Sequence, residues 1–259
     1  PVDRPAWLAQ IAEWKQKYPL RYEHNGRIKP QEVVETLGKI TDHDAIVATG
    51  VGQHQMWAAQ FYGWRRPRQI ITSGGLGTMG FGCPAAIGAQ FGNPGRTVID
   101  IDGDGSFTMT MVEVITAVQN DLPVKFVVLN NGYLGMVRQW QDMFYNRRYS
   151  GVHHPCPDFA KVAEAFGARG IRIADRSELA DGLATLTLLV ASIPLDGSRA
   201  QVGSSTELRN EMKPPGVTWE IVVRLDDGRF RVVLQDDPGP LRADDKVKIV
   251  EGKVQLRGN

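Results

Sequence analysis

The sequence predicts an α/β protein with a parallel sheet flanked by helices, followed by a small antiparallel β tail. Apolar stretches of strand length at 97–102 and 124–129 are separated by helical segments, a pattern typical of βαβ units. Beyond about residue 190 the sequence becomes rich in Ser, Gly and Pro, and alternating apolar residues follow. We therefore expect a lead-in helix and linker at 1–29, a domain at 30–190, a linker at 191–216 and a β-hairpin unit at 217–259.

The first two expected helices lie before the sheet. Trp7, Leu8, Ile11 and Trp14 recur at helical spacing, which predicts the lead-in helix. A second helix is expected from Pro30, because the first turn of a helix tolerates proline.

The α/β domain alternates strands and helices from there on. Strands are expected at 45–49, 69–72, 97–102 and 124–129, with helices near 84–90 and 109–118 and a Gly-rich loop after Thr49. Parallel sheets of this kind bind ligands at the carboxyl ends of their strands.

The tail shows the two-residue period of β-strands. Apolar and polar residues alternate at 219–225 and 230–234, on either side of the turn residues Asp227-Gly228, which predicts a hairpin. Glu251-Gly252 predicts the turn of a second hairpin.

Composition excludes several classes of protein. Thirty basic and 29 acidic residues leave a formal net charge of +1, so charge gives no argument for binding nucleic acid. The apolar stretches are shorter than the ~20 residues that a membrane span needs. Cys83 and Cys156 lack the spacing of a zinc site or disulfide framework. The chain opens on Pro1 rather than Met, and we interpret it as a piece of a longer, cytoplasmic protein.

Two polar segments follow neighbouring predicted strands. Gly103-Asp104-Gly105-Ser106 comes after one strand and Asn130-Asn131 after the next, and Asp104 and Asn131 are 131 − 104 = 27 residues apart. One βαβ step needs about this length, so both side chains are expected at the same edge of the sheet.

Their chemistry indicates a metal site. A carboxylate, an amide oxygen and a backbone carbonyl form a hard, incomplete oxygen site that suits Mg²⁺ when a phosphate completes it. Gly103 and Gly105 allow a diphosphate to approach the backbone. A lone GDG is more often only a tight turn, and the second segment at one βαβ interval makes the metal interpretation the stronger one.

These segments also resemble a known family. GDGSF through LNN is similar to the thiamine-diphosphate fingerprint, and LNNGYLGMVRQWQDMFY, TSGGLGTMGFGCPAAIGAQ and VGQHQMWAAQ resemble acetohydroxyacid synthase (acetolactate synthase). The resemblance covers roughly residues 5–185 and corresponds to the C-terminal thiamine-diphosphate-binding domain of the catalytic subunit.

The resemblance implies roles for individual residues. Asp104 and Asn131 would bind Mg²⁺ through side chains and Tyr133 through its backbone carbonyl. The residues implied to contact the cofactor are Gln53, His54, Gly77, Met79, Gly103, Gly105 and Ser106. Met136, Val137 and Trp140 would line the substrate channel, although the same spacing is equally typical of an amphipathic helix.

The implied activity is that of a transferase in branched-chain amino acid biosynthesis, which decarboxylates pyruvate and condenses it with a second 2-keto acid. No catalytic residue is expected in this chain, since the family's activating glutamate and its FAD-binding domain belong to other parts of the enzyme. The isolated chain is therefore expected to be inactive. Expected partners are those N-terminal domains, a further copy of the chain and a regulatory subunit, with no nucleic acid and no membrane span.

Several alternatives remain open at this point. Another thiamine-diphosphate decarboxylase or carboligase would share the same motifs, and the chain could be a non-catalytic cofactor-binding fragment. Gly75, Gly77 and Gly80 also fit G-x-G-x-x-G, with Asp100 and Asp102 about twenty residues on, which would suit a Rossmann oxidoreductase. His153-His154 is interpreted as a solvated loop. The family's last strand is expected to be missing or replaced at 185–193.

Overall fold

The computed structural model describes residues 4–184, 189–195, 219–224, 230–235, 247–250 and 253–256. They belong to two compact units. The first contains the described residues up to 141 and from 149 to 195, and the second contains residues 142–148 and the strands from 219 onwards. Within these described ranges, no helix is long and apolar enough to cross a membrane.

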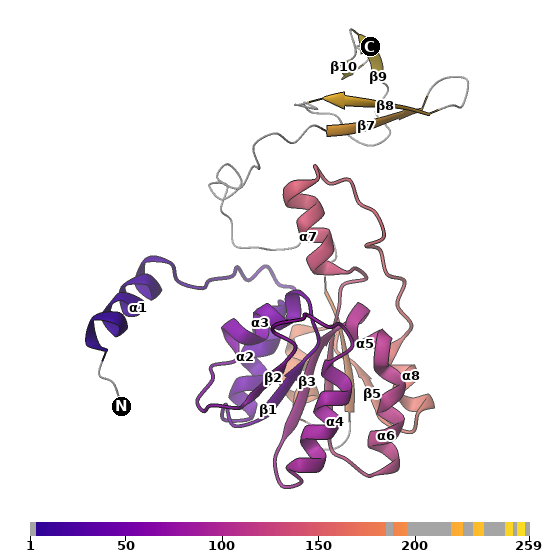
Figure 1. Ribbon diagram of the computed structural model, residues 1–259. Helices are drawn as coiled ribbons and strands as arrows, with labels where there is room; N and C mark the ends of the chain where they lie inside the picture. Colours follow the sequence, from indigo (N-terminus) through magenta and orange to yellow (C-terminus); the bar gives the residue numbers. More distant parts are fainter. Residues whose placement is uncertain are drawn as a thin grey trace. The chain divides into compact units, whose positions relative to one another are not determined.

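A six-stranded sheet forms the centre of the first unit (Figure 1). Its strands lie in the order β2-β1-β3-β4-β6-β5, and every neighbouring pair is parallel. The strands are β1 (Ile46–Thr49), β2 (Ile70–Thr72), β3 (Val98–Gly103), β4 (Lys125–Asn130), β5 (Arg169–Arg172) and β6 (Leu189–Pro194). The predicted α/β class with a parallel sheet is confirmed.

The order of the strands creates a switch point between β1 and β3. From β1 the chain passes to β2 at the edge of the sheet, then returns to place β3 on the other side of β1 and continues to β4. Ile99 in β3 lies opposite Val47 in β1 and Lys125 in β4. In open parallel sheets such a point, at the carboxyl ends of the strands, is where ligands bind.

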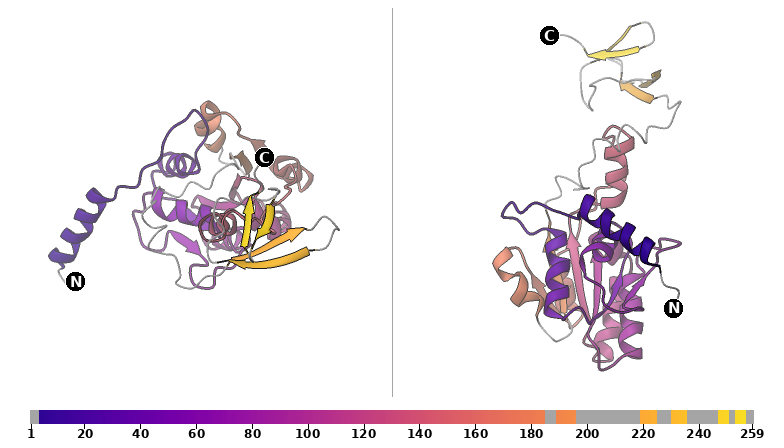
Figure 2. Two further views of the ribbon diagram at one scale, coloured as in Figure 1. Left: turned by 90° about the horizontal axis from the view of Figure 1, so that it is seen from above. Right: turned by 90° about the vertical axis from the view of Figure 1, so that its left-hand side faces the viewer.

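Helices cover both faces of this sheet, and Figure 2 shows them in two further views. The helices of the described residues are α1 (Pro5–Lys17), α2 (Pro30–Ile40), α3 (Gln53–Phe61), α4 (Gly82–Gly92), α5 (Asp104–Thr110), α6 (Val114–Gln119), α7 (Gly135–Phe144), α8 (Phe159–Ala165) and α9 (Leu179–Leu183), with 3₁₀ turns at Met111–Glu113 and Arg176–Glu178, and those that cover the sheet are α2 to α6, α8 and α9. Helix α1 has no buried residue.

The two faces of the sheet bury separate apolar clusters. On one face, α2, α3 and α9 pack against residues such as Ile99 and Ile101 of β3. On the other, α4, α5, α6 and α8 pack against residues such as Val98 of β3 and Phe126 of β4. Because side chains alternate along a strand, Asp100 and Asp102 of β3 share a face with Val98, next to α4.

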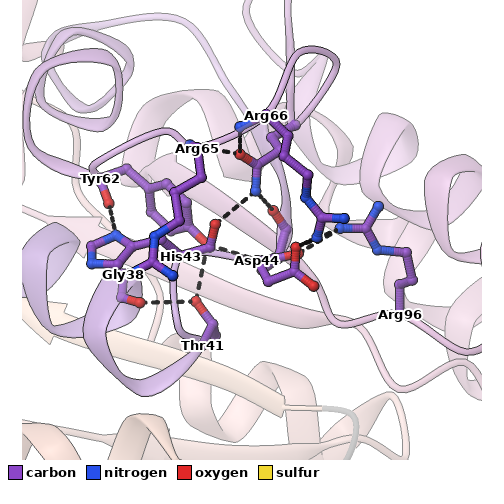
Figure 3. Close-up of polar contacts among 10 residues, drawn as sticks. Gly38, Thr41, His43, Asp44, Tyr62, Arg65, Arg66 and Arg96 are labelled. Carbon is purple, nitrogen blue, oxygen red and sulfur yellow. Dashed lines mark hydrogen bonds and ion pairs between the residues drawn. The ribbon is translucent and has the colours of Figure 1, made fainter.

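The amino edge of the sheet carries a polar network (Figure 3). The buried Gln69 accepts the backbone N–H groups of Arg65 and Arg66 at 2.9 and 2.7 Å and donates to the His43 carbonyl at 2.7 Å. Asp44 forms ion pairs with Arg66 and with Arg96. These hydrogen bonds and ion pairs hold together the three segments that lead into β1, β2 and β3.

The second unit contains two antiparallel strand pairs. Strand β7 (Trp219–Arg224) pairs with β8 (Phe230–Gln235), and β9 (Val247–Val250) pairs with β10 (Lys253–Leu256). The turns predicted at 227–228 and 251–252 lie outside the described residues. That the whole of 217–259 forms one unit, like the other predicted boundaries, stays a prediction.

Two local expectations differ from the structure, and a third is narrowed by it. Helix α3 occupies a segment predicted as loop, because its buried residues Gln53, His54 and Ala58 give no apolar period. The helix expected at 109–118 is broken at Thr110, whose backbone is non-helical and whose hydroxyl donates to the Gly80 carbonyl at 2.9 Å. The family's last strand was expected to be missing or replaced, and a strand is present there as β6, paired with β4 and β5, so only its loss is excluded.

Candidate cofactor and metal site

A pocket opens at the carboxyl edge of the sheet, over the switch point between β1 and β3. The loops that follow β1, β3 and β4 form its wall, together with the starts of α3, α5 and α7. Its lining residues are Val51, Gly52, Gln53, His54, Trp57, Met79, Gly103, Asp104, Gly105, Ser106, Leu129, Asn131, Tyr133, Leu134, Gly135, Met136 and Val137.

Asp104 is the first residue of α5, directly after β3. It is only 2% exposed, and its Oδ2 accepts a hydrogen bond from the Cys156 thiol at 3.0 Å. Burial raises the pKa of Asp104, while this hydrogen bond and one from the Asn131 backbone oppose the rise. Burial also raises the pKa of Cys156 to about 12, so at neutral pH the thiol keeps the proton that it donates.

Asn131 and Tyr133 lie in the loop after β4. The Asn131 side-chain oxygen accepts the Tyr133 backbone N–H at 2.9 Å, a local bond that shapes the loop. Gly132 between them has a φ of +71°, which glycine adopts without strain. The structure thus brings Asp104 and Asn131 to one pocket, as the 27-residue interval predicted, and Tyr133 lines the same pocket.

Glycines keep the floor of the pocket open. A Cβ at Gly103 would lie 2.6 Å from His54 Nδ1, and one at Gly105 would lie 2.4 Å from Leu134 Cδ2. At Gly103 a side chain would force the buried His54 ring to move, whereas at Gly105 the neighbour is the end of the flexible Leu134 side chain, which can give way. The backbone beside Asp104 is therefore bare of side chains, as an oxygen-rich ligand such as a diphosphate would need. These residues fit a metal–diphosphate group in both shape and donor chemistry.

Buried polar groups lie directly behind this floor. His54 Nε2 is 3.3 Å from Asp102 Oδ1, and Ser106 Oγ accepts the Gly80 N–H at 2.9 Å. Burial lowers the pKa of His54 to about 4 and raises that of Asp102. The imidazole is therefore neutral at pH 7, and the His54–Asp102 contact is not a full ion pair. Neither oxygen of the neighbouring Asp100 has a hydrogen-bond partner among the residues that the structure describes.

Gln53 connects two walls of the pocket. Its side-chain N–H donates to Gln139 on α7 at 2.9 Å, and a Cβ at Gly135 would lie 2.3 Å from Gln53 Oε1. The first turns of α3 and α7 are thus held against each other by a buried amide pair.

The other predicted residues differ in their positions. Met79, Met136 and Val137 line the pocket. Gly77, with a φ of +68°, and Trp140, which is 57% exposed, are not among its lining residues. Trp140 lies on α7 one turn beyond Met136, and its exposure does not fit the alternative of a helix face turned to the core.

Some lining residues were not predicted. Four of them have no group that marks a catalytic or metal-binding residue in a sequence: Gly52, Trp57, Leu134 and Gly135. Cys156 was dismissed for lack of metal-ligand spacing, yet it contacts Asp104 across 52 positions of sequence. Gly135 is the first residue of α7, and its need for glycine comes from the nearby Gln53 side chain, which the sequence does not show.

Comparison with known proteins decides the family. The family described as thiamine pyrophosphate enzyme, C-terminal TPP binding domain, matches residues 50–189, which is more than half of the chain. The chain belongs to the thiamine pyrophosphate enzymes. This family domain contains the loops after β1, β3 and β4, and with them the whole pocket.

Individual thiamine pyrophosphate enzymes agree with the resemblance drawn from the motifs. The acetolactate synthase catalytic subunit of Saccharomyces cerevisiae is 54% identical over 183 residues, 68% of this chain and 27% of the relative. Acetolactate synthase isozyme 3 large subunit of Escherichia coli is 47% identical over 201 residues, 74% of this chain and 35% of the relative. Acetolactate synthase 1 of Nicotiana tabacum is 49% identical over 187 residues, 69% and 28%. The resemblance to acetolactate synthase is confirmed, and the chain spans about a third or less of these relatives.

The thiamine pyrophosphate family replaces the Rossmann alternative, and the structure gives the physical reason. The Gly75–Gly80 segment follows the edge strand β2 instead of a central strand. Asp100 and Asp102, the acidic residues that would bind a ribose, are fully buried within β3. They cannot reach a dinucleotide at the surface.

Proposed function

We propose that this chain is the thiamine-diphosphate-binding part of an acetolactate synthase, which joins pyruvate to a second 2-keto acid after decarboxylation. The main observation in support of this proposal is that one pocket, at the switch point of a thiamine pyrophosphate enzyme domain, is lined by Asp104, Asn131 and Tyr133. Relatives about 50% identical that are named acetolactate synthase support the choice among carboligases.

Asp104, Asn131 and Tyr133 would hold Mg²⁺ in this proposal. Their carboxylate, amide and carbonyl oxygens are the hard ligands that Mg²⁺ prefers, and Mg²⁺ usually keeps further positions for phosphate and water. The raised pKa of Asp104 fits such a role, because a buried carboxylate without a cation is penalised by desolvation. A bound cation would favour its ionised form.

The glycines and the polar floor would hold the cofactor. Gly103 and Gly105 admit the diphosphate to the backbone, and Gln53, His54 and Ser106 offer polar contacts from the surrounding loops. A neutral His54 can donate one hydrogen bond without adding charge. Met79 would support the aminopyrimidine from the β2–α4 loop, in which we also propose a contact by Gly77.

Thiamine diphosphate supplies the carbon nucleophile of the reaction when bound, and the protein supplies position and exclusion of water. Met136 and Val137 present apolar side chains to the pocket, and together with Trp140 they would line the substrate channel. No residue of this chain is proposed to exchange a proton with the cofactor.

The remaining components would come from elsewhere in the parent enzyme. We propose that an activating glutamate, an FAD-binding domain, a second copy of the chain and a regulatory subunit complete it, and that residues 30–190 are its cofactor domain between a lead-in segment at 1–29 and a linker at 191–216. The relatives include proteins named mitochondrial, chloroplastic and, in Escherichia coli, a large subunit. A cytoplasmic location stays a prediction.

A pair of carboxylate variants tests the metal assignment. Asp104→Ala should weaken Mg²⁺-dependent binding of thiamine diphosphate by more than about 100-fold, since even outer partners of a metal site contribute 10–100-fold. Asp44→Ala removes a carboxylate from the opposite edge of the sheet and should leave the affinity unchanged. Calorimetric titration of both variants measures this, and full affinity of Asp104→Ala would refute the assignment.

A further inference from the structure

Backbone hydrogen bonds connect the segment 152–156 to the loop after β4, which contains Asn131 and Tyr133. The Leu134 N–H donates to the Val152 carbonyl at 2.8 Å, and the His154 N–H donates to the Gly132 carbonyl at 2.8 Å. Between these bonds Tyr133 and His153 form an antiparallel bridge. The two histidines lie in a loop, as predicted, with His153 exposed, and the backbone of this loop is hydrogen-bonded to the loop after β4.

The same segment also reaches α5, which holds the other half of the site. His154 Nε2 lies 3.3 Å from Thr108 Oγ1, and the Cys156 thiol donates to Asp104 Oδ2 at 3.0 Å. The 152–156 segment therefore contacts both halves of the site by hydrogen bonds: the loop after β4 through its backbone, and α5 through its side chains.

We propose that Cys156 is a positioning residue, whose thiol holds the Asp104 carboxylate in the orientation that receives Mg²⁺. This rests on the proposed function, in which Asp104 is a metal ligand. Rotation of a carboxyl group about its last bond is broad and weakly restrained. A donor on Oδ2 restricts that rotation, and the Asn131 backbone hydrogen bond to the same carboxylate acts with it.

Packing alone is the competing explanation for Cys156. Its side chain is partly buried against the apolar cluster that contains Phe107 and Phe159, and a small apolar residue would fill that space equally well. A purely structural role would lower stability without changing the metal dependence of cofactor binding. A positioning role requires a hydrogen-bond donor, which serine keeps and alanine lacks.

The test is a magnesium titration of the full chain at a fixed concentration of thiamine diphosphate, followed by calorimetry. Cys156→Ala should raise the Mg²⁺ concentration at half-saturation about five-fold, the usual contribution of one hydrogen bond. Cys156→Ser should stay within about two-fold of the unsubstituted chain. Cys83→Ala, the same substitution in the buried wall of α4, is the matched control and should leave the midpoint unchanged.

The outcomes separate this inference from the metal assignment. If Asp104→Ala abolishes the magnesium dependence while Cys156→Ala leaves the midpoint unchanged, only the positioning role is overturned. Equal shifts for Cys156→Ser and Cys156→Ala would also overturn it, because packing would then explain both. If the chain shows no magnesium dependence, or Asp104→Ala retains it, both proposals fail. Melting temperatures of all variants show whether each one is folded under the titration conditions.

Discussion

The two edges of the parallel sheet differ in how completely their buried polar groups are hydrogen-bonded. At the amino edge, buried Gln69 has partners on both its oxygen and its nitrogen, and Asp44 pairs with two arginines (Figure 3). At the carboxyl edge, within the described part of the chain, both oxygens of Asp100, one oxygen of Asp102 and His54 Nε2 have no hydrogen-bond partner. The amino edge leaves one such buried atom among its described residues, Gln90 Oε1, whereas the edge with the pocket gathers several of them.

The close backbone packing at the carboxyl edge should make it the less tolerant of added atoms. A Cβ at Gly50 would lie 1.9 Å from Asp102 Oδ1 and 2.3 Å from Ser106 Oγ. Gly50→Ala should therefore destabilise the fold by about 3 kcal/mol or more. Gly88→Ala, on α4 with nothing within 4 Å, should instead stabilise by about 0.5–1 kcal/mol. Urea denaturation of both variants makes the comparison, and similar effects of the two would contradict it.

At the amino edge, the fully paired side chain should matter more than the exposed ion pairs. Gln69→Ala leaves the Arg65 and Arg66 N–H groups and the His43 carbonyl without their partner, which should cost about 2–3 kcal/mol. Arg66→Ala removes a half-exposed ion pair with Asp44 and should cost less than about 1 kcal/mol. Chemical denaturation measures both, and a larger loss for Arg66→Ala would show that the charges dominate this edge.

The unpaired carboxylate behind the pocket should leave a signature in the pH dependence of stability. Burial, with the nearby Asp102 charge, holds the pKa of Asp100 well above its usual value of 3.8. The folded state thus binds its proton more tightly than the unfolded state, so this group's contribution to stability falls as pH rises from about 4 through the raised pKa. Asparagine does not titrate, so the stability of Asp100→Asn does not include this fall with rising pH.

Relative to the unsubstituted chain, Asp100→Asn should therefore gain at least about 1 kcal/mol between pH 5 and pH 8. Melting temperatures at the two pH values give the difference for each protein. A difference between the two proteins that is the same at both pH values would mean that Asp100 does not titrate in this range.

The central strands and the meeting of Asp104 with Asn131 could be predicted from sequence because each follows a local rule. Residues 97–102 and 124–129 are mostly apolar segments of strand length, and one βαβ interval implies that Asp104 and Asn131 meet. Helix α3 escaped prediction because its buried face contains Gln53 and His54, which carry no apolar signal. These polar residues face inward because they line the pocket, and a pocket leaves no periodic pattern in the sequence.

The contact between Cys156 and Asp104 could not be predicted for a different reason. It depends on the path of the chain from α7 to α8, where Val152 and His154 bond to the loop after β4. No spacing rule relates a loop residue to a partner on another element. At 185–193 the sequence left open whether the last strand is missing or replaced, and Val190, Ala191 and Ile193 are buried in the sheet, because pairing with β4 and β5 needs apolar side chains there and not a particular family sequence.

Calorimetric titration of the full chain with thiamine diphosphate, with and without Mg²⁺ and with NAD in parallel, tests the central claim most directly. We expect thiamine diphosphate to bind only when Mg²⁺ is present, and we expect no binding of NAD. Binding of NAD without a metal, or binding of thiamine diphosphate that is indifferent to Mg²⁺, would contradict the assignment of this pocket.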